Sequence, residues 1–338
     1  MKLAPVSPIA NPDLQARIQR RLDSLTKPPG GLGRLEALAL QLGMIQGTDL
    51  SAIGRRAMLI FCADHGIVEE GVSLYPAEVT RQMVANFNAG GAAITVLCRH
   101  FGIEPMVVDM GVGKPTRNFA REAAMTRQEA ENAIEAGIAR ADAADVLGAG
   151  EMGIGNSTSA AALLSAFSGL DPIETAGHGT GLDDAGVIRK AGVIRRALAL
   201  HKPYPRDPIG VLSAVGGREI AAIAGLILGA AARRRVVVLD GFISCSAALA
   251  AGKLAPASLD YVIFSHRSAE RGHRRMLEYL GAKPLFDLDL RLGEGSGAAL
   301  GINLLEAAVR LYREMSTFED AGVSTSTRLA GSRSGEAH

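Results

Sequence analysis

Short apolar runs alternate with longer amphipathic stretches along most of the chain. Five runs rich in aliphatic and β-branched residues predict strands, at residues 57–63, 104–111, 144–150, 235–241 and 260–266, and a weaker sixth run lies at residues 283–289. The segments between them repeat apolar positions at helical spacing, as in PAEVTRQMVANF and IAAIAGLILGAAAR. Strands that alternate with helices pair in parallel through right-handed crossovers. The pattern therefore predicts an α/β fold with a doubly wound parallel sheet.

Two helices are predicted ahead of the first strand, over about residues 12–25 and from residue 35 onward. The segment between them, KPPGGLGR, is rich in proline and glycine and predicts a rigid break. Lys27 and Arg34 bracket this break, and we interpret both as solvated charges beside a turn. At the other end of the sequence, residues 325–338 are polar and lack an apolar pattern, so we predict a disordered tail there.

The composition narrows the class of protein. The 338 residues are 48% hydrophobic and carry a net charge of +1, which gives no electrostatic basis for binding nucleic acid. The longest apolar segment, residues 220–232, has about 13 residues, whereas a membrane-spanning helix needs about 20. The first residues lack the apolar core of a signal peptide, and the three cysteines form no C-x-x-C pair. We therefore expect a cytoplasmic protein that contacts neither nucleic acid nor membrane.

Two glycine-rich stretches carry the most informative chemistry. One is GAGEMGIGNSTSAA at residues 148–161, and the other is RLGEGSGAALGINLLEAA at residues 291–308. Each holds one Glu among glycines, Glu151 and Glu294, and each leads into an alanine-rich helix. Ligands of parallel sheets bind at the carboxyl ends of strands, and helix N-termini favour anions, so these stretches predict a phosphate-bearing substrate and acid or base chemistry. The alternative is that the glycines serve turn geometry alone.

Three polar residues near these stretches are further candidates. Asn156 or Ser157 is expected to be the N-cap of the first alanine-rich helix. Lys190 follows the glycine-rich segment GHGTGLDDAG, and a lysine there is a compact cation suited to a phosphate. The alternative for Lys190 is a solvated helix face shared with Arg195 and Arg196.

Other catalytic chemistries have little support in the sequence. Asp64, His65 and His266 belong to no compact metal motif. No G-x-S-x-G sequence is present to supply a serine nucleophile. Asp240 stands alone after its predicted strand, whereas a magnesium diphosphoribose site uses paired acids there. We therefore expect neither a metal nor a cofactor.

Eight segments, in order and spread over residues 14–324, carry a resemblance to a known family. They are SLTKPPGGLGRLE, CADHGIVEEGVSLYPAEVT, GAGEMGIGNSTSAAALL, GTGLDDAG, VLSAVGGREIAAIAGLILGAA, LDGFISCSAALAA, SHRSAERG and LRLGEGSGAALGINLLEAA. Together they closely resemble the nicotinate-nucleotide:5,6-dimethylbenzimidazole phosphoribosyltransferases of cobalamin lower-ligand assembly. The resemblance implies transfer of 5-phosphoribose from nicotinate mononucleotide to 5,6-dimethylbenzimidazole, giving α-ribazole 5′-phosphate and nicotinate.

The resemblance also implies an architecture and an assembly. The sheet should be Rossmann-like and lie in an α/β domain formed by residues 51–300. Residues 1–50, as a helical arm, and residues 301–324, as a helix and catalytic segment, should form a smaller domain. The family assembles as a homodimer.

The family's general base is a Glu shortly after the helix that follows GEGSGAAL. In this sequence the carboxylates of that segment are Glu314, Glu319 and Asp320. Glu314 should still lie within the helix, so we assign Glu319, although an ungapped comparison with some relatives places Thr317 there. Such a base should be half-buried, because burial raises the pKa of a carboxyl towards neutrality.

The resemblance further implies which residues bind substrate. Glu151 matches a second pocket carboxylate, and Lys190 matches a phosphate or ribose contact. Tyr75 and Met83 fall where some relatives carry Ser and Gln in the base pocket. The other residues expected to bind substrate are Met152, Gly153, Asn156, Ser157, Gly295, Ser296 and Gly297, with Gly153, Ser296 and Gly297 in the phosphate turns. Two alternative functions are a related phosphoribosyltransferase with another aromatic base as acceptor, and a non-catalytic nucleotide-binding regulator.

Overall fold

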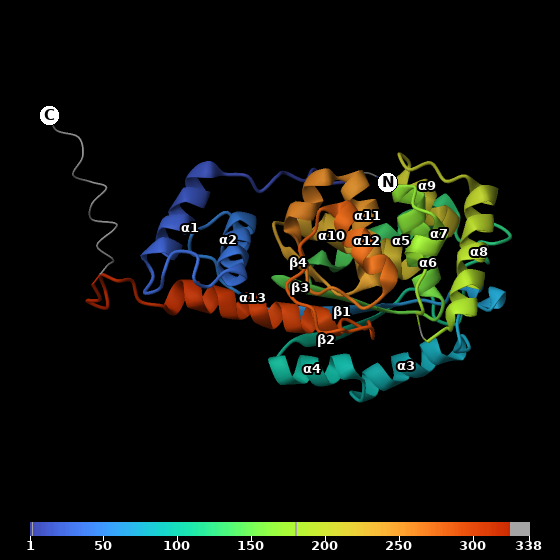
Figure 1. Cartoon of the computed structure of the whole chain (residues 1–338), viewed down its shortest axis with the longest axis horizontal. Coiled ribbons are helices and arrows are strands. Elements are labelled where there is room, and N and C mark those ends of the chain that lie inside the picture. The colour runs from blue at the N-terminus through green and yellow to red at the C-terminus, as the bar shows by residue number, and fades with distance from the viewer. Residues whose placement is uncertain (2, 180, 325–338) are drawn as a thin grey trace. The chain divides into compact units, whose positions relative to one another are not determined.

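The computed structural model describes residues 1, 3–179 and 181–324, and the predicted tail lies outside this part (Figure 1). Its centre is a five-stranded sheet in the order β2-β1-β3-β4-β5, and every neighbouring pair is parallel. The strands are β1 (Arg56–Cys62), β2 (Glu104–Asp109), β3 (Val146–Met152), β4 (Val236–Leu239) and β5 (Val262–Phe264). The five predicted strands are thus confirmed, as is the α/β class.

The weaker sixth run does not form a strand. Within it, Phe286 makes only an isolated bridge to His266, beside the end of β5. Pro284 has no backbone N–H to donate to a neighbouring strand, and Asp289 has a φ of 54°, which interrupts an extended backbone.

Helices connect the strands and make up most of the remaining structure. They are α1 (Pro12–Ser24), α2 (Arg34–Gln46), α3 (Glu78–Ala89), α4 (Ala93–Phe101), α5 (Arg127–Ala139), α6 (Asn156–Ser168), α7 (Pro172–Thr175), α8 (Asp184–His201), α9 (Pro208–Val215), α10 (Arg218–Ala232), α11 (Phe242–Leu254), α12 (Arg271–Leu280) and α13 (Ser296–Glu314). The two helices predicted ahead of the first strand are α1 and α2.

The chain divides into two compact units. Unit 1 comprises Met1–Ile9 and Ile53–Asn303 and contains the whole sheet. Unit 2 comprises Ala10–Ala52 and Leu304–His338, so it combines segments from both ends of the sequence. Helix α13 begins in unit 1 and ends in unit 2.

Both faces of the sheet are buried. Leu59 and Phe61 of β1 belong to the main apolar cluster of unit 1, together with most of α10 and α11. Met58 and Ile60 alternate with them and therefore point to the other face, yet they are also fully buried. Figure 1 shows α10, α11 and α12 on one side of the sheet and α3 and α4 on the other. Helices on both faces explain why β1 and β4 are apolar and buried along almost their whole length, whereas the edge strand β2 is partly exposed.

Glycines bring α5 and α10 into direct backbone contact. A Cβ atom on Gly225 of α10 would overlap the carbonyl oxygen of Ile134, and one on Gly137 of α5 would overlap that of Ala222. Both obstacles are helix backbone, which cannot rotate away as a flexible side chain can. The spacing between these two helices therefore depends on glycine at both positions.

We expect Gly225→Ala to destabilise the protein by about 1–3 kcal/mol, because the added methyl group forces two packed helices apart. Urea unfolding followed by circular dichroism measures this change. Gly192→Ala in α8 is the matched control, since only the far end of the Arg196 side chain comes within 4.0 Å of an added Cβ there. The control should be neutral or up to about 1 kcal/mol more stable, because alanine has the higher helix propensity. Equal effects at the two positions would contradict this account of the α5–α10 contact.

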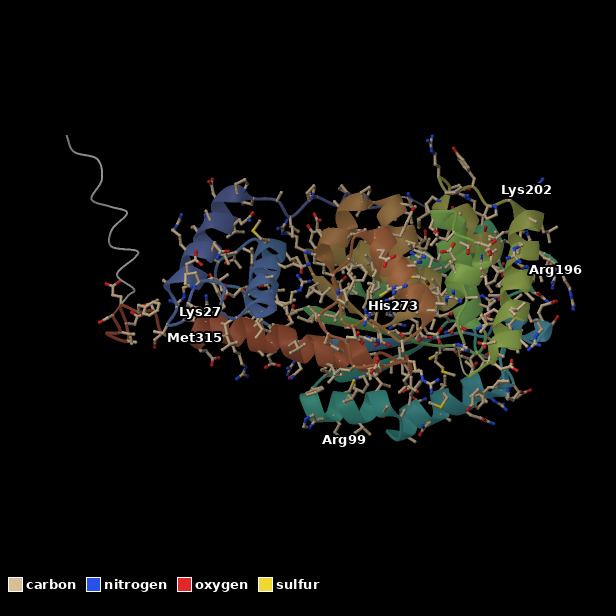
Figure 2. The ribbon with its side chains drawn as sticks, viewed as in Figure 1. Lys27, Arg99, Arg196, Lys202, His273 and Met315 are labelled. Carbon is tan, nitrogen blue, oxygen red and sulfur yellow. The ribbon has the colours of Figure 1, made fainter. Side chains whose placement is uncertain are left out.

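In unit 2, the loop after α1 meets the segment after α13. The backbone N–H of Thr26 donates to the carbonyl of Ser316 at 3.1 Å, and Figure 2 shows Lys27 and Met315 close together at this point. Lys27 is only 7% exposed and forms a 2.9 Å ion pair with Glu36 in the first turn of α2. The prediction of a solvated Lys27 was therefore wrong. Glu36 reaches back across the break, and a buried ammonium requires such a partner.

Candidate active site

The first glycine-rich stretch forms the end of β3, a tight turn and the start of α6. A Cβ on Gly153 would lie 2.5 Å from the carbonyl oxygen of Ala63, and Gly155 has a φ of 97°, so glycine is required at both positions. Gly155 is also the N-cap of α6, which begins at Asn156. The predicted N-cap at Asn156 or Ser157 was wrong, because both side chains have other partners. Asn156 donates to Glu151, and Ser157 accepts from Lys190.

The second glycine-rich stretch turns sharply just before α13. Gly293, Glu294 and Gly295 all have positive φ, at 88°, 65° and 100°. This turn packs directly on β3, since a Cβ on Gly150 would overlap the carbonyl oxygen of Glu294. A Cβ on Gly293 would lie 2.6 Å from the Glu151 side chain. The two stretches therefore meet at the carboxyl end of β3, although they begin at residues 148 and 291, which are 143 positions apart.

Asp240, which follows β4, occupies the N-terminus of α13. Its Oδ2 accepts from the N–H of Gly295 at 3.0 Å, and its Oδ1 accepts from those of Gly297 at 2.7 Å and Ala298 at 3.2 Å. The hydroxyl of Ser296 donates to the carbonyl of Gly293 at 2.8 Å. The N–H groups of Gly295 and Gly297, two residues expected from the sequence to bind substrate, therefore bind a carboxylate of the protein itself.

Lys190 reaches the start of α6 from α8. Its side chain is buried, with the residue 1% exposed, and its Nζ donates to the carbonyl of Gly177 at 3.1 Å and to Oγ of Ser157 at 3.3 Å. Burial lowers the pKa of Lys190 to about 8, and the charge of Glu270 opposes this shift. Arg196 on the same helix is exposed and points outward, paired with Glu70 (Figure 2). The alternative of a solvated helix face therefore holds for Arg196 and not for Lys190.

Glu151 is a buried carboxyl, 5% exposed, at the end of β3. Burial raises its pKa from an ordinary value of 4.5 to about 8, and the charges of Asp240 and Glu219 add to this shift, while the hydrogen bond from Asn156 opposes it. This shift favours the protonated form of Glu151 at neutral pH. A carboxyl in this state can donate a hydrogen bond as well as accept one.

This pKa predicts a pH dependence of stability. Since the folded-state pKa of Glu151 lies above the unfolded value, its contribution to folding is complete below about pH 4.5 and is lost as the pH rises to about 8. Glu151→Gln mimics the neutral carboxyl, so we expect the variant to lose fewer degrees of melting temperature than the wild type between pH 5 and pH 8.5. Thermal unfolding at the two pH values measures this difference. An identical loss in both proteins would show that Glu151 does not titrate in this range.

Glu294 is a functional candidate that the sequence linked to acid or base chemistry without assigning it a specific role. It is 5% exposed, and its Oε2 has no hydrogen-bond partner in the described structure. Burial raises its pKa, and a hydrogen bond from the backbone N–H of Ile94 opposes the shift. A residue other than glycine in the left-handed region costs about 1–2 kcal/mol. In the sequence, the sign of a functional role was a Glu between two glycines. A third glycine at this position would relieve the strain of the left-handed backbone.

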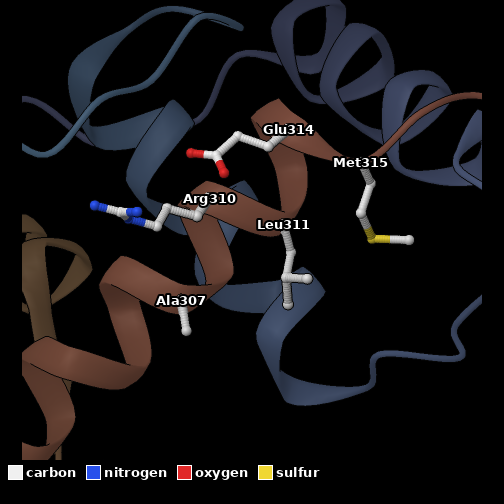
Figure 3. A pocket seen from close by; sticks show the side chains of 5 residues that line it. All are labelled: Ala307, Arg310, Leu311, Glu314 and Met315. Atoms are coloured by element: carbon white, nitrogen blue, oxygen red, sulfur yellow. The ribbon is translucent and has the colours of Figure 1, made fainter.

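The carboxylates near the end of α13 lie in unit 2 and are exposed. Glu314 is the last residue of α13, as expected, and lines a surface hollow with Arg310, Met315 and their neighbours Ala307 and Leu311 (Figure 3). Glu319 follows the helix and is exposed in the single chain, so the expected half-burial is absent there. Asp320 accepts from the hydroxyl of Thr317 at 2.6 Å in a local turn.

Two residues expected in the base pocket lie on α3 or in the loop before it, and α3 contacts the first turn. Thr80 of α3 accepts the backbone N–H of Ile154 at 3.1 Å, which fixes this helix against the turn. Met83 is half-buried on α3, and Tyr75, in the loop before it, is 51% exposed. Met152 is half-buried at the end of β3.

His65, weighed in the sequence as a metal ligand, instead joins two helices. Its Nε2 lies 2.6 Å from Oε1 of Glu219 on α10, and its Nδ1 lies 3.1 Å from Oγ of Ser159 on α6. No group of three or more His, Cys, Asp or Glu side chains among the described residues is arranged to hold a metal ion. In the same part of the chain, no helix combines the length and apolar character that a membrane span requires.

Comparisons with known proteins identify the family of the chain. A family model described as phosphoribosyltransferase matches residues 8–323. The nicotinate-nucleotide–dimethylbenzimidazole phosphoribosyltransferase of Geobacter sp. (strain M21) is 50% identical over 343 residues, covering 96% of this chain and 98% of that protein. The crystal structure of the enzyme of that name from Thermus thermophilus has a TM-score of 0.88 and 44% identity, covering 94% of this chain and 100% of that chain. The chain therefore belongs to the nicotinate-nucleotide–dimethylbenzimidazole phosphoribosyltransferase family.

Proposed function

We propose that the protein transfers 5-phosphoribose from nicotinate mononucleotide to 5,6-dimethylbenzimidazole, in the assembly of the cobalamin nucleotide loop. The products are α-ribazole 5′-phosphate and nicotinate. The observation that carries this proposal is the meeting of the two glycine-rich turns, which places the buried carboxyls of Glu151 and Glu294 together at the end of β3. Lys190 joins the same region through Ser157.

The phosphate of the nucleotide binds at the start of α6 in this proposal. An ammonium group has three N–H donors, and Lys190 uses two of them on uncharged oxygens, so one donor and the positive charge remain for an anion. Gly153 allows the backbone to approach the ligand, and the first residues of α6, Asn156 and Ser157, complete this side. Gly295, Ser296 and Gly297 shape the pocket instead, because Asp240 accepts the N–H groups of Gly295 and Gly297, and the carbonyl of Gly293 accepts that of Ser296.

The reaction then requires one base. As one ring nitrogen of the benzimidazole attacks C1′ of the ribose, the bond from C1′ to the nicotinate nitrogen breaks and its electron pair stays on nicotinate. Attack on the face opposite the leaving group converts the β nucleotide into the α product. The new benzimidazolium still carries an N–H, and a carboxylate within hydrogen-bond reach removes this proton.

Glu294 is the carboxylate with the stronger support for this role. A base needs a pKa near the working pH, and burial raises the pKa of Glu294, whose Oε2 is unpaired. Glu319, the assignment from the sequence, is exposed and lies in unit 2. Glu319 remains the alternative, which requires another surface to bury it. In the proposed homodimer, the second protomer is the candidate for that surface.

The acceptor is the least constrained part of the proposal. Tyr75, Met83 and Met152 contribute the side of the pocket that receives the base. The alternative function, transfer to another aromatic base, differs from the main proposal only here. Purified protein should release nicotinate from nicotinate mononucleotide with 5,6-dimethylbenzimidazole, and a panel of other benzimidazoles, purines and phenols tests the alternative. No release with any acceptor would contradict both and favour a nucleotide-binding regulator.

The finer description of the fold and assembly is also part of the proposal. The strand order and the helices on both faces support a doubly wound, Rossmann-like sheet. The composition of unit 2 from both chain ends supports a smaller helical domain. Three buried free cysteines are in keeping with a cytoplasmic enzyme.

We expect activity without a divalent metal ion. Nicotinate is bonded through a cationic ring nitrogen and departs as an uncharged nitrogen at that position, so no leaving diphosphate has to be neutralised. The rate of nicotinate release should change less than about twofold after treatment with a chelator, well below the effect of losing a catalytic group. Loss of turnover that magnesium restores would contradict the prediction.

A further inference from the structure

We propose that Asp240 is a positioning residue for the reaction, which holds the turn containing Glu294 in its strained conformation. The inference rests on the proposed function, because it assigns a role relative to the proposed base. Asp240 itself touches neither substrate nor reacting atom in this account. It acts through the backbone of the neighbouring turn.

The hydrogen bonds of Asp240 fix the turn immediately after Glu294. Gly295, the next residue, donates to one carboxylate oxygen, while Gly297 and Ala298 in the first turn of α13 donate to the other. Asp240 is fully buried and follows β4, so these bonds tie the helix start to the sheet. Burial raises the pKa of Asp240 to about 7, and the three N–H donors oppose this shift. The donors therefore favour the ionised carboxylate, in which the hydrogen bonds are charge-assisted and about twice as strong as neutral ones.

The other side of the turn is fixed by contact with β3. The carbonyl of Glu294 lies against the Cα of Gly150, where no side chain would fit. The Glu294 backbone is therefore held between a strand and the Asp240 anchor. Without the anchor, a left-handed Glu has a lower-energy conformation available, and its carboxylate would leave the position beside Glu151.

Side chains that can carry charge face Asp240 from several elements. The charge of Asp240 raises the pKa of Glu151 on β3. Nδ1 of His266, which follows β5, lies 3.8 Å from Oδ1 of Asp240. Burial lowers the pKa of His266 to about 4, so this ring is neutral at pH 7. The backbone N–H groups are therefore the partners that a substitution of Asp240 changes most directly.

Asp240→Asn tests the role, because an amide keeps the shape but turns an NH₂ group or a weaker acceptor towards the backbone donors. We expect the rate constant for nicotinate release to fall about 10- to 100-fold, since a small displacement of a catalytic group has effects of this size. The dissociation constant of nicotinate mononucleotide should change less than about threefold, because the proposed phosphate site at Lys190 is intact.

The decisive measurement repeats the substitution in a Glu294→Gln background. If Asp240 acts through Glu294, Asp240→Asn should then lower the residual single-turnover rate by less than about twofold. Equal losses in both backgrounds, or a loss of nucleotide binding as large as the loss of rate, would overturn the positioning role. Asp207→Asn is the matched control, because Asp207 also accepts the backbone N–H of a helix start, at Gly210 of α9. It should keep the wild-type rate.

Circular dichroism and thermal unfolding show whether the variants fold. Asp240→Ser is the second variant, since its hydroxyl retains one acceptor and leaves room for water. If neither Asp240 variant folds, the carboxylate stabilises the whole of unit 1 and has no specific role in the turn. This result would overturn the proposal. A wild-type protein that releases no nicotinate contradicts the proposed function itself. An active wild type with additive losses contradicts only the role of Asp240.

Discussion

Glu294→Gln should lower the rate of nicotinate release by about 100- to 10,000-fold while nicotinate mononucleotide still binds, because glutamine cannot accept the proton of the benzimidazolium. The amide has nearly the shape of the carboxyl, so the turn before α13 should keep its conformation. Steady-state assays of nicotinate release and calorimetric titration with nicotinate mononucleotide separate the two effects. The rate constant should carry the loss, with the dissociation constant nearly unchanged.

Glu319→Gln is the matched control for this experiment. It removes the same charge from an exposed residue of unit 2, and we expect a change of less than about threefold, as for a group without a catalytic role. If Glu319→Gln loses the activity and Glu294→Gln keeps it, Glu319 is the general base, as the sequence predicted. The assignment of Glu294 from its burial is then wrong. If Glu151→Gln alone loses it, the base is the carboxyl at the end of β3.

Lys190→Met should weaken the binding of nicotinate mononucleotide by about 10- to 100-fold, the loss expected for one hydrogen bond to a charged group. The rate at saturating substrate should change little, because the ammonium contacts the phosphate in both ground state and transition state. Methionine fills a similar volume without the charge. Calorimetric titration measures the binding, and saturation kinetics measure the rate.

The same variant should not melt at a lower temperature than the wild type. Burial lowers the pKa of Lys190 to about 8, so the folded protein holds this ammonium at a free-energy cost. Lys190→Met should therefore weaken the binding of nicotinate mononucleotide without lowering the stability of the fold. A variant with a lower melting temperature and unchanged affinity would identify Lys190 as a structural residue.

The alternation of apolar runs was sufficient to predict the sheet. Buried parallel strands such as β4 and most of β1 consist of continuous apolar residues, and this pattern is local in the sequence. The run at residues 283–289 shows the limit of the method, because its composition resembles a strand while Pro284 removes one of the backbone donors. Local composition predicts whether a segment can be buried. Whether the segment pairs as a strand also depends on the backbone N–H groups along it.

The candidate site was only partly predictable, for a different reason. The sequence shows that Glu151 and Glu294 each lie among glycines, but only the contact of the Glu294 turn with Gly150 shows that the two meet. Burial, which sets the pKa of a carboxyl, comes from elements far away in the sequence. The sequence therefore could not distinguish a buried Glu294 from an exposed Glu319. Lys27 was misjudged for the same reason, since its partner Glu36 lies beyond the break.

The backbone contacts of Gly150 also have a consequence for how this enzyme family can change. Nothing larger than hydrogen fits at this position, so Gly150 admits no substitution that leaves the Glu294 turn in place. The loop and helix that carry Tyr75 and Met83 are under no such restriction, because those side chains are exposed or half-buried. In the proposed site, new acceptor preferences can therefore be selected in a library at these two positions without disturbing Glu151 and Glu294.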